Sequence, residues 1–167
     1  MVHPPDSSPE HRVESLEMAS RAVAWRQARP KDVPDTRAHR AALGRALYLA
    51  ERWDQAEELF DGLANETPGE PEYIGWSGLC AAARGNQARA RAASRVLQDL
   101  SDPMLHGYHT LWRANLAAAL GEREPAVDLL REAMAQGGVY GLHIHNTPAL
   151  KSLRDYPPFE ELVRPKG

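Results

Sequence analysis

Histidines are the residues of this chain best suited to chemistry. His106 and His109 stand three positions apart, a spacing that places both side chains on one face of a helix. His143 and His145 alternate on a segment without regular periodicity, and the four imidazoles together could hold a metal ion. No cysteine lies near them and no His-Glu-x-x-His spacing occurs, so histidines in structural or solvated positions are the alternative interpretation. We predict no bound metal and no cofactor.

The sequence offers less support for nucleophilic catalysis. The one cysteine, Cys80, lies beside Leu79 in an expected helix, where a buried thiol is unreactive. The sequence contains no Gly-x-Ser-x-Gly elbow, no Walker loop and no dinucleotide fingerprint. The adjacent carboxylates Glu57 and Glu58 point apart on a helix and are predicted to be solvated. We therefore expect a protein that is not an enzyme.

A group of arginines could bind phosphate groups. Its members lie at the end of one expected helix and along the next: Arg84, Arg89, Arg91 and Arg95. No aromatic residues alternate with them for base stacking, and a net charge of -3 gives no general attraction to nucleic acid. The sequence also lacks a run of about 18 apolar residues. It therefore predicts neither nucleic-acid binding nor membrane binding.

The composition indicates one helical globular domain. The chain has 167 residues, of which 43% are hydrophobic and 26% are charged, and it contains only two phenylalanines. Its apolar residues are mainly Ala and Leu, which favour helices. A single cysteine cannot form an internal disulfide and fits a reducing compartment, so we expect a cytoplasmic location. Residues 1–9, rich in Pro and Ser, are expected to form a flexible leader.

An internal repeat predicts the elements that would position these residues. Three segments align at a period of about 34 residues, typical of helical hairpins. Their small-residue positions are Gly44, Gly78 and Ala114. The turn positions that follow are Glu51, Gly85 and Gly121, and the positions of close helix approach are Ala56, Ala90 and Ala126.

Apolar spacing and the placement of proline predict the helices. An N-terminal helix is expected at 10–28, with an apolar stripe of Val13, Leu16, Ala19, Val23 and Ala24. Three repeats are expected at 37–70, 71–104 and 107–140, with helices at 37–50, 54–65, 71–84, 87–100, 105–120 and 124–136. Short helices at 147–154 and 159–163 would contribute Leu150, Leu153, Tyr156, Phe159 and Leu162. Residues 10–36 and 141–167 are predicted to cap the two ends, because stacked repeats leave a hydrophobic face at each end.

Residues 37–140 resemble three tetratricopeptide repeats. Leu43 and Gly44 match the "LG" of that motif, Trp53 the aromatic position after the turn, Phe60 the later aromatic position, and Pro68 the end of the unit. The final segment is similar to one that closes such arrays in bacterial multidomain proteins. The resemblance implies an all-α fold, an α-solenoid of antiparallel helix pairs wound into a right-handed superhelix with helical caps.

The resemblance also implies a binding face. In that family the first helix of each repeat lines a concave groove, and the matching positions here are Arg45, Tyr48, Leu49, Glu72, Leu79, Tyr108, Leu111 and Asn115. Polar anchors, tyrosines and a floor of leucines and small alanines suit an extended or helical peptide. Packing between neighbouring helices is the alternative role for Tyr48, Leu79 and Leu111. Core packing is likewise the alternative to a binding role for Trp76 and Trp112.

Three functions are compatible with these patterns. The first is a noncatalytic scaffold that binds a peptide or protein segment in the concave face. The second is a regulatory or docking portion of a larger multidomain bacterial enzyme or regulator, contacting its own chain or self-associating with a second copy. The third is a metal-binding protein built on His106, His109, His143 and His145.

Overall fold

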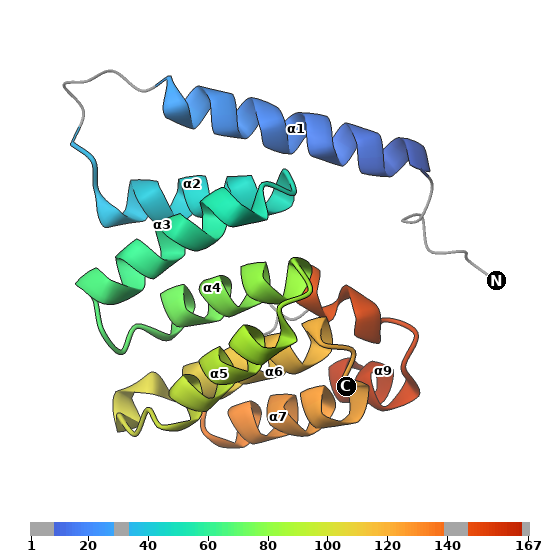
Figure 1. Ribbon diagram of the computed structural model, residues 1–167. Helices are drawn as coiled ribbons and strands as arrows, with labels where there is room; N and C mark the ends of the chain where they lie inside the picture. The colour runs from blue at the N-terminus through green and yellow to red at the C-terminus, as the bar shows by residue number, and fades with distance from the viewer. Residues whose placement is uncertain (1–8, 29–33, 139–146, 165–167) are drawn as a thin grey trace.

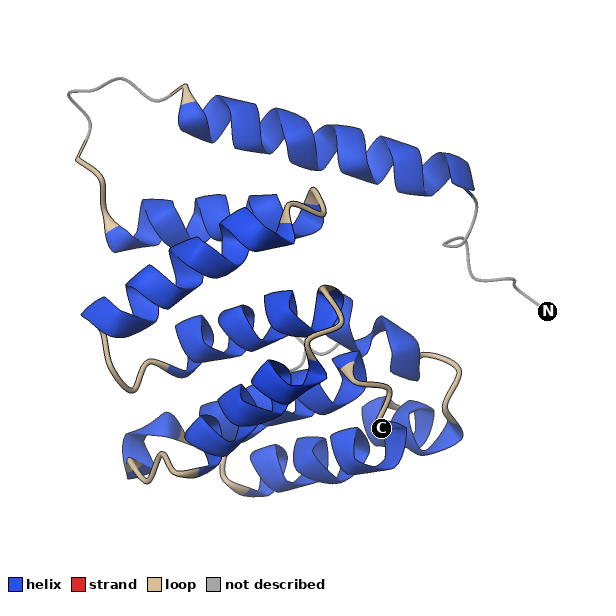
Figure 2. Ribbon diagram, in the orientation of Figure 1, coloured by secondary structure: helices blue, strands red, loops and turns tan. Residues whose placement is uncertain are grey.

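The computed structural model describes residues 9–28, 34–138 and 147–164, and in these ranges the chain is all-α, without strands (Figures 1 and 2). Its helices pack mainly against their neighbours in the sequence and form an α-solenoid of antiparallel helix pairs. The expected fold class is confirmed.

The helices lie within three residues of the predicted ranges. The helix α1 (Pro9–Gln27) precedes three pairs: α2 (Arg37–Leu49) with α3 (Trp53–Glu66), α4 (Pro71–Ala83) with α5 (Gln87–Gln98), and α6 (Tyr108–Ala119) with α7 (Arg123–Ala135). A 3-10 turn, η1 (Pro103–Leu105), lies between α5 and α6, and η2 (Pro148–Leu153) and α9 (Pro157–Val163) follow at the C-terminal end.

Capping residues explain several of the helix starts. The Thr36 hydroxyl accepts a hydrogen bond from the His39 backbone amide at 3.2 Å, and the Asn86 side chain accepts one from Arg89 at 3.2 Å. Pro71 begins α4, where its missing N–H needs no partner.

The three hairpin turns share one backbone geometry. Glu51, Gly85 and Gly121 have φ values of 57°, 81° and 80°. The backbone amide that follows each one donates to a carbonyl in the last turn of the preceding helix, at 2.9 Å (Arg52 to Leu47), 2.8 Å (Asn86 to Ala81) and 2.9 Å (Glu122 to Ala117). This is the left-handed helix end that glycine favours, so the predicted turn positions are confirmed. Only the first turn adopts it with a residue other than glycine.

Small residues permit the close helix approaches. A Cβ added at Gly44 would lie 2.7 Å from the Phe60 ring, and one at Gly75 would lie 2.2 Å from the Trp112 ring. The equivalent alanines Ala56, Ala90 and Ala126 are all fully buried. Two apolar clusters result, one around Phe60 and Trp76 and the other between α6, α7 and the C-terminal segment.

The C-terminal segment covers one end of the solenoid. Its η2 turn packs on α6, and α9 packs on α7 (Figure 1). Leu150, Leu153 and Phe159 are buried there, and Tyr156 and Leu162 pack against them, as the sequence predicts. The Ser152 hydroxyl donates to the Ala118 carbonyl at 3.1 Å, which fixes η2 over the C-terminal end of α6.

The apolar stripe predicted for α1 is partly wrong. Ala19 and Val23 are buried against α2, but Val13 is 55% exposed and Ala24 is also exposed. The helix is rotated so that the half-buried Ala22 flanks the contact instead. Ala22 follows Ala19 by three residues and Val23 follows it by four, so the three side chains lie on one side of the helix. Val13 and Ala24 do not lie on that side.

Among the described residues, no helix combines the length and apolar character that a membrane crossing requires.

Candidate functional site

The first helices of the three pairs, α2, α4 and α6, contribute one continuous face, which we call the inner face. On it, the Arg45 guanidinium lies 2.5 Å from the Glu72 carboxylate. Their side chains are 41% and 29% exposed, so the pair connects α2 to α4 while remaining accessible to a ligand. Tyr108 of α6 lies within reach of their charges: burial raises its pKa, and the Glu72 carboxylate adds to the effect. Three of the predicted site residues are therefore gathered here.

A row of aromatic rings supports this face. Trp76 makes an edge contact with Tyr48 at 5.1 Å between ring centroids and stacks on Phe60 at 5.6 Å. It also contacts Trp112 at 5.6 Å, and Trp112 contacts Tyr108 at 6.1 Å. Because Trp76 is 8% exposed and Trp112 is 6% exposed, both belong to the core. They hold the tyrosines in place and are not themselves available to a partner.

Beside the aromatic row lies a pocket of about 320 Å³, which we call the alanine pocket. Its solenoid wall comes from Tyr48, Leu79, Ala82, Ala83, Ala118 and Ala119, and its opposite wall from Pro148, Ala149, Lys151 and Ser152. Tyr48, Ala82 and Ala118 each stand three residues before a hairpin turn, so the repeat supplies one equivalent position from each pair. The volume is at the lower end of the range for ligand sites.

Tyr48 lies between the aromatic row and the alanine pocket. It lines the alanine pocket and contacts Trp76 of the aromatic row. Burial raises its pKa to about 12, so its hydroxyl stays protonated and can donate a hydrogen bond. The inner face therefore combines a polar strip, formed by Arg45 and Glu72, with the Tyr48 hydroxyl and the small apolar alanine pocket.

The remaining predicted site residues differ widely in exposure. Leu79 is 1% exposed and forms the floor of the alanine pocket, whereas Leu111 is 6% exposed and belongs to the core under the C-terminal segment. Asn115 is 3% exposed, and no described residue is hydrogen-bonded to its Oδ1. Leu49, at the end of α2, is 51% exposed. Arg45, Tyr48, Leu49, Glu72 and Tyr108 are thus the members that solvent reaches.

The role of the C-terminal segment in lining the pocket is not predicted by the sequence. Pro148, Ala149, Lys151 and Ser152 form one of its walls, although this segment was predicted only to cap the last repeat. The signal present in the sequence was Thr147-Pro148, which predicts where a helix begins but not which face that helix covers.

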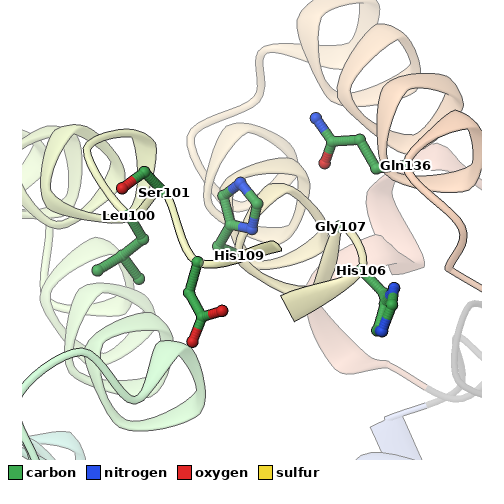
Figure 3. A pocket seen from close by; sticks show the side chains of 7 residues that line it. Leu100, Ser101, His106, Gly107, His109 and Gln136 are labelled. Atoms are coloured by element: carbon green, nitrogen blue, oxygen red, sulfur yellow. The ribbon is translucent and has the colours of Figure 1, made fainter. Parts of the chain in front are cut away.

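A second pocket, of about 310 Å³, contains two of the four histidines considered for a metal site, His106 and His109 (Figure 3). It is lined by Leu100, Ser101, Asp102, His106, Gly107, His109 and Gln136. The Asp102 carboxylate accepts a hydrogen bond from the Met104 amide at 2.9 Å, and Gln136 accepts one from the Thr110 hydroxyl at 2.7 Å. The first of these hydrogen bonds lies within the α5–α6 connection, and the second joins α6 to the C-terminal end of α7.

The predicted shared helix face of His106 and His109 is wrong. α6 begins at Tyr108, after Gly107 with φ 80°, and His106 lies outside the helix with φ 44°. The two rings consequently point in different directions (Figure 3). His143 and His145 lie outside the described residues, and within the described ranges no three metal-binding side chains come together.

Three of the four arginines of this group, Arg84, Arg89 and Arg91, form ion pairs with carboxylates. Glu57, predicted to be solvated, is instead 6% exposed and lies 2.5 Å from Arg84 and 2.6 Å from Arg89. Arg89 also lies 2.5 Å from Asp61. The prediction failed because Glu57 follows Ala56 on the packed side of α3, where two arginines compensate the cost of burying its charge.

Cys80 is a buried thiol, as predicted. Burial raises its pKa to about 12, with the carboxylates of Glu57 and Asp61 adding to the effect. A thiol in this state is a poor nucleophile at neutral pH.

No family model, no curated protein and no solved structure matches the chain. Its function has to be inferred from the geometry of its own residues.

Proposed function

We propose that this chain is a noncatalytic interaction module of the tetratricopeptide type, which binds an extended peptide or protein segment along its inner face. The observation that carries the proposal is that Tyr48, which lines the alanine pocket, follows Arg45 of the half-buried Arg45–Glu72 pair by three residues on α2. A peptide laid along this face would place an apolar side chain in the pocket and its backbone beside the polar strip. The cytoplasmic location expected from the single cysteine is part of this proposal.

The dimensions of the pocket restrict the ligand. Alanines and Leu79 form its solenoid wall, so it suits a small or medium apolar side chain. The Tyr48 hydroxyl and the Arg45–Glu72 pair offer donors and an acceptor for polar groups of the ligand backbone. Lys151 is exposed at the C-terminal wall and would favour an acidic residue in the ligand.

The direct test is selection of peptides from a displayed random library on the purified chain. The blocking variant is Ala119→Trp, because Ala119 is exposed and lines the pocket. The matched control is Ala88→Trp, which makes the same change at an exposed alanine of α5 away from the pocket.

We expect selected peptides to share an apolar position, to bind the native chain and the Ala88→Trp variant alike, and to lose at least about tenfold in affinity for Ala119→Trp. Arg45→Glu should weaken binding as well, because it places two carboxylates side by side. Peptides that bind Ala119→Trp as tightly as the native chain would show that the inner face is not the site.

A further inference from the structure

The helix α1 continues the repeat frame of the three helix pairs. Ala22 stands 34 residues before Ala56, the position of close helix approach in the first pair. Gln27 likewise stands 34 residues before Asp61. In this register α1 corresponds to the second helix of a pair, the role that α3, α5 and α7 have in the three complete pairs.

The contacts that α1 makes with the first pair follow the same register. In α3, Asp61 accepts a hydrogen bond from Ser77 at 2.6 Å and lies 2.5 Å from Arg89, and both of these partners belong to the second pair. The three equivalent positions one repeat earlier line a single pocket: Gln27, Leu43 and Gln55. The helix α1 therefore lies on the first pair as α3 lies on the second.

The second helix of each complete pair also packs on the first helix of its own pair. The alanine of close approach is fully buried in all three: Ala56, Ala90 and Ala126. The position three residues later is half-buried and packs against the core: Leu59, Ala93 and Leu129. A Cβ added at Gly78 of α4 would lie 2.8 Å from the Ala93 Cβ, so this side of a second helix directly faces its first helix.

The equivalent side of α1 has no first helix on it among the described residues. Ala22 is only half-buried, and Trp25, the equivalent of Ala93, is 73% exposed. The Arg26 guanidinium lies 5.7 Å from the centre of the Trp25 ring and leaves most of the side chain open. Met18, one turn before Ala22, is 64% exposed. At about 100° per residue, Met18, Ala22 and Trp25 fall within about 60° of one another, and we call them the open face of α1.

We propose that the open face of α1 is a docking site for one amphipathic helix of a partner protein, which takes the place that a first helix has in the three complete pairs. Those pairs indicate the chemistry of the partner. Their first helices run antiparallel to the second helices and carry a small residue at the close approach: Gly44, Gly78 and Ala114. The partner helix should likewise run antiparallel to α1 and present a glycine or an alanine within an apolar stripe. The open face shares no residue with the inner face, so this proposal does not depend on peptide binding there.

A synthetic peptide with the sequence of residues 35–50 is the probe, because this segment contains α2, itself a first helix. Titration of the peptide into the full chain is followed by nuclear magnetic resonance through the indole N–H signal of Trp25. We expect a saturable shift of this signal in the native chain and at least about tenfold weaker binding to Met18→Glu. The control is Val96→Glu, which places the same charge at an exposed apolar residue of α5 and should leave the affinity unchanged.

Enlarging the small residues separates specific docking from general stickiness. Ala22→Leu adds apolar surface to the open face but should weaken peptide binding by at least about tenfold, because it prevents the close helix approach. Gly44→Leu in the peptide should weaken binding for the same reason. Circular dichroism of each protein variant confirms that the helices are retained.

Absence of a saturable shift of the Trp25 signal would overturn the proposal. Equal affinity of the peptide for the native chain and for Ala22→Leu would overturn it as well, because general stickiness would then explain the binding. Sedimentation of the native chain without peptide tests the other occupant. A dimer that Met18→Glu dissociates would assign the open face to a second copy of this chain and not to a different partner.

Discussion

At the C-terminal end of the solenoid, η2 and α9 bury Leu150, Leu153 and Phe159 to 4% exposure or less. At the N-terminal end, Ala19 and Val23 are the side chains of residues 12–27 that the longer α1 buries to 8% or less. The difference lies in side-chain size and placement, not in the amount of helix. Stabilisation by burial follows the apolar area removed from water, so a short irregular segment with large side chains seals an end more completely than a long helix with small ones.

The two ends also differ in what they offer to other molecules. The C-terminal segment covers the third helix pair and at the same time forms a wall of the alanine pocket. The N-terminal helix leaves Met18 and Trp25 exposed on a side of its own. One end thus completes a proposed binding site, and the other leaves two large apolar side chains exposed.

Truncation of buried side chains gives the largest expected contrast between the ends. Phe159→Ala should lower the free energy of unfolding by about 3–5 kcal/mol, because Phe159 is 4% exposed between α9 and α7. Trp25→Ala, which removes a larger but exposed side chain, should change it by no more than about 0.5 kcal/mol. Urea denaturation of both variants measures the difference. Equal losses would mean that α1 stabilises the fold as much as the C-terminal segment does.

The next largest expected effect concerns the contact between α4 and α6, the helix on which η2 packs. Gly75→Ala should cost about 1–3 kcal/mol, because the new methyl group would lie 2.2 Å from the Trp112 ring. Gly62→Ala in α3 is the matched control: no atom lies within 4 Å of the added group, and alanine favours the helix by up to about 1 kcal/mol. Thermal unfolding of the two variants should therefore shift in opposite directions, and a shift in the same direction would contradict the described packing.

The first hairpin turn, toward the N-terminal end, can be compared with the equivalent second turn. Glu51→Gly should stabilise the chain by up to about 1 kcal/mol, because a left-handed backbone at φ 57° is unfavourable for glutamate. The lost ion pair with Arg12 is solvent-exposed and offsets little of this gain. Gly85→Ala, at the equivalent turn with φ 81°, should destabilise by a similar amount. Chemical denaturation measures both, and a loss of stability in Glu51→Gly would show that the Arg12 contact holds α1 in place.

The smallest expected effect concerns the core between the two ends. The pKa of Cys80 rises from 9.0 to about 12 on folding, so the folded chain retains a proton that the unfolded chain releases. Stability is therefore complete below about pH 9 and falls as the pH rises toward 12, by about 1 kcal/mol at pH 10. Unfolding measured between pH 8 and pH 10 should show this loss in the native chain and a shallower slope in Cys80→Ala. Equal slopes would mean that a group other than Cys80 causes the pH dependence.

The helical pairs could be predicted from the sequence because their signals are local. Proline and glycine mark the helix ends, and the positions of Glu51, Gly85 and Gly121 predict the three turns. Ala56 and Ala90 identify the sites of close approach for the same reason: only a small side chain fits there.

What the sequence did not predict depends on contacts between distant segments. The burial of Glu57 requires Arg84 and Arg89 from the next helix pair, and the alanine pocket requires the C-terminal segment to lie over α6. The position of His106 outside α6 follows from the left-handed Gly107, where a Cβ would lie 2.5 Å from the Ala133 carbonyl. A single sequence carries no record of such distant contacts.

Hydrogen exchange of the native chain tests the contrast between the ends most directly. Amides of η2, α6 and α7 should be well protected, because large buried side chains pack these elements together. Amides of α1 should exchange faster, because Ala19 and Val23 are the described side chains that α1 buries to 8% or less. Protection of α1 that equals that of α7 would contradict the account.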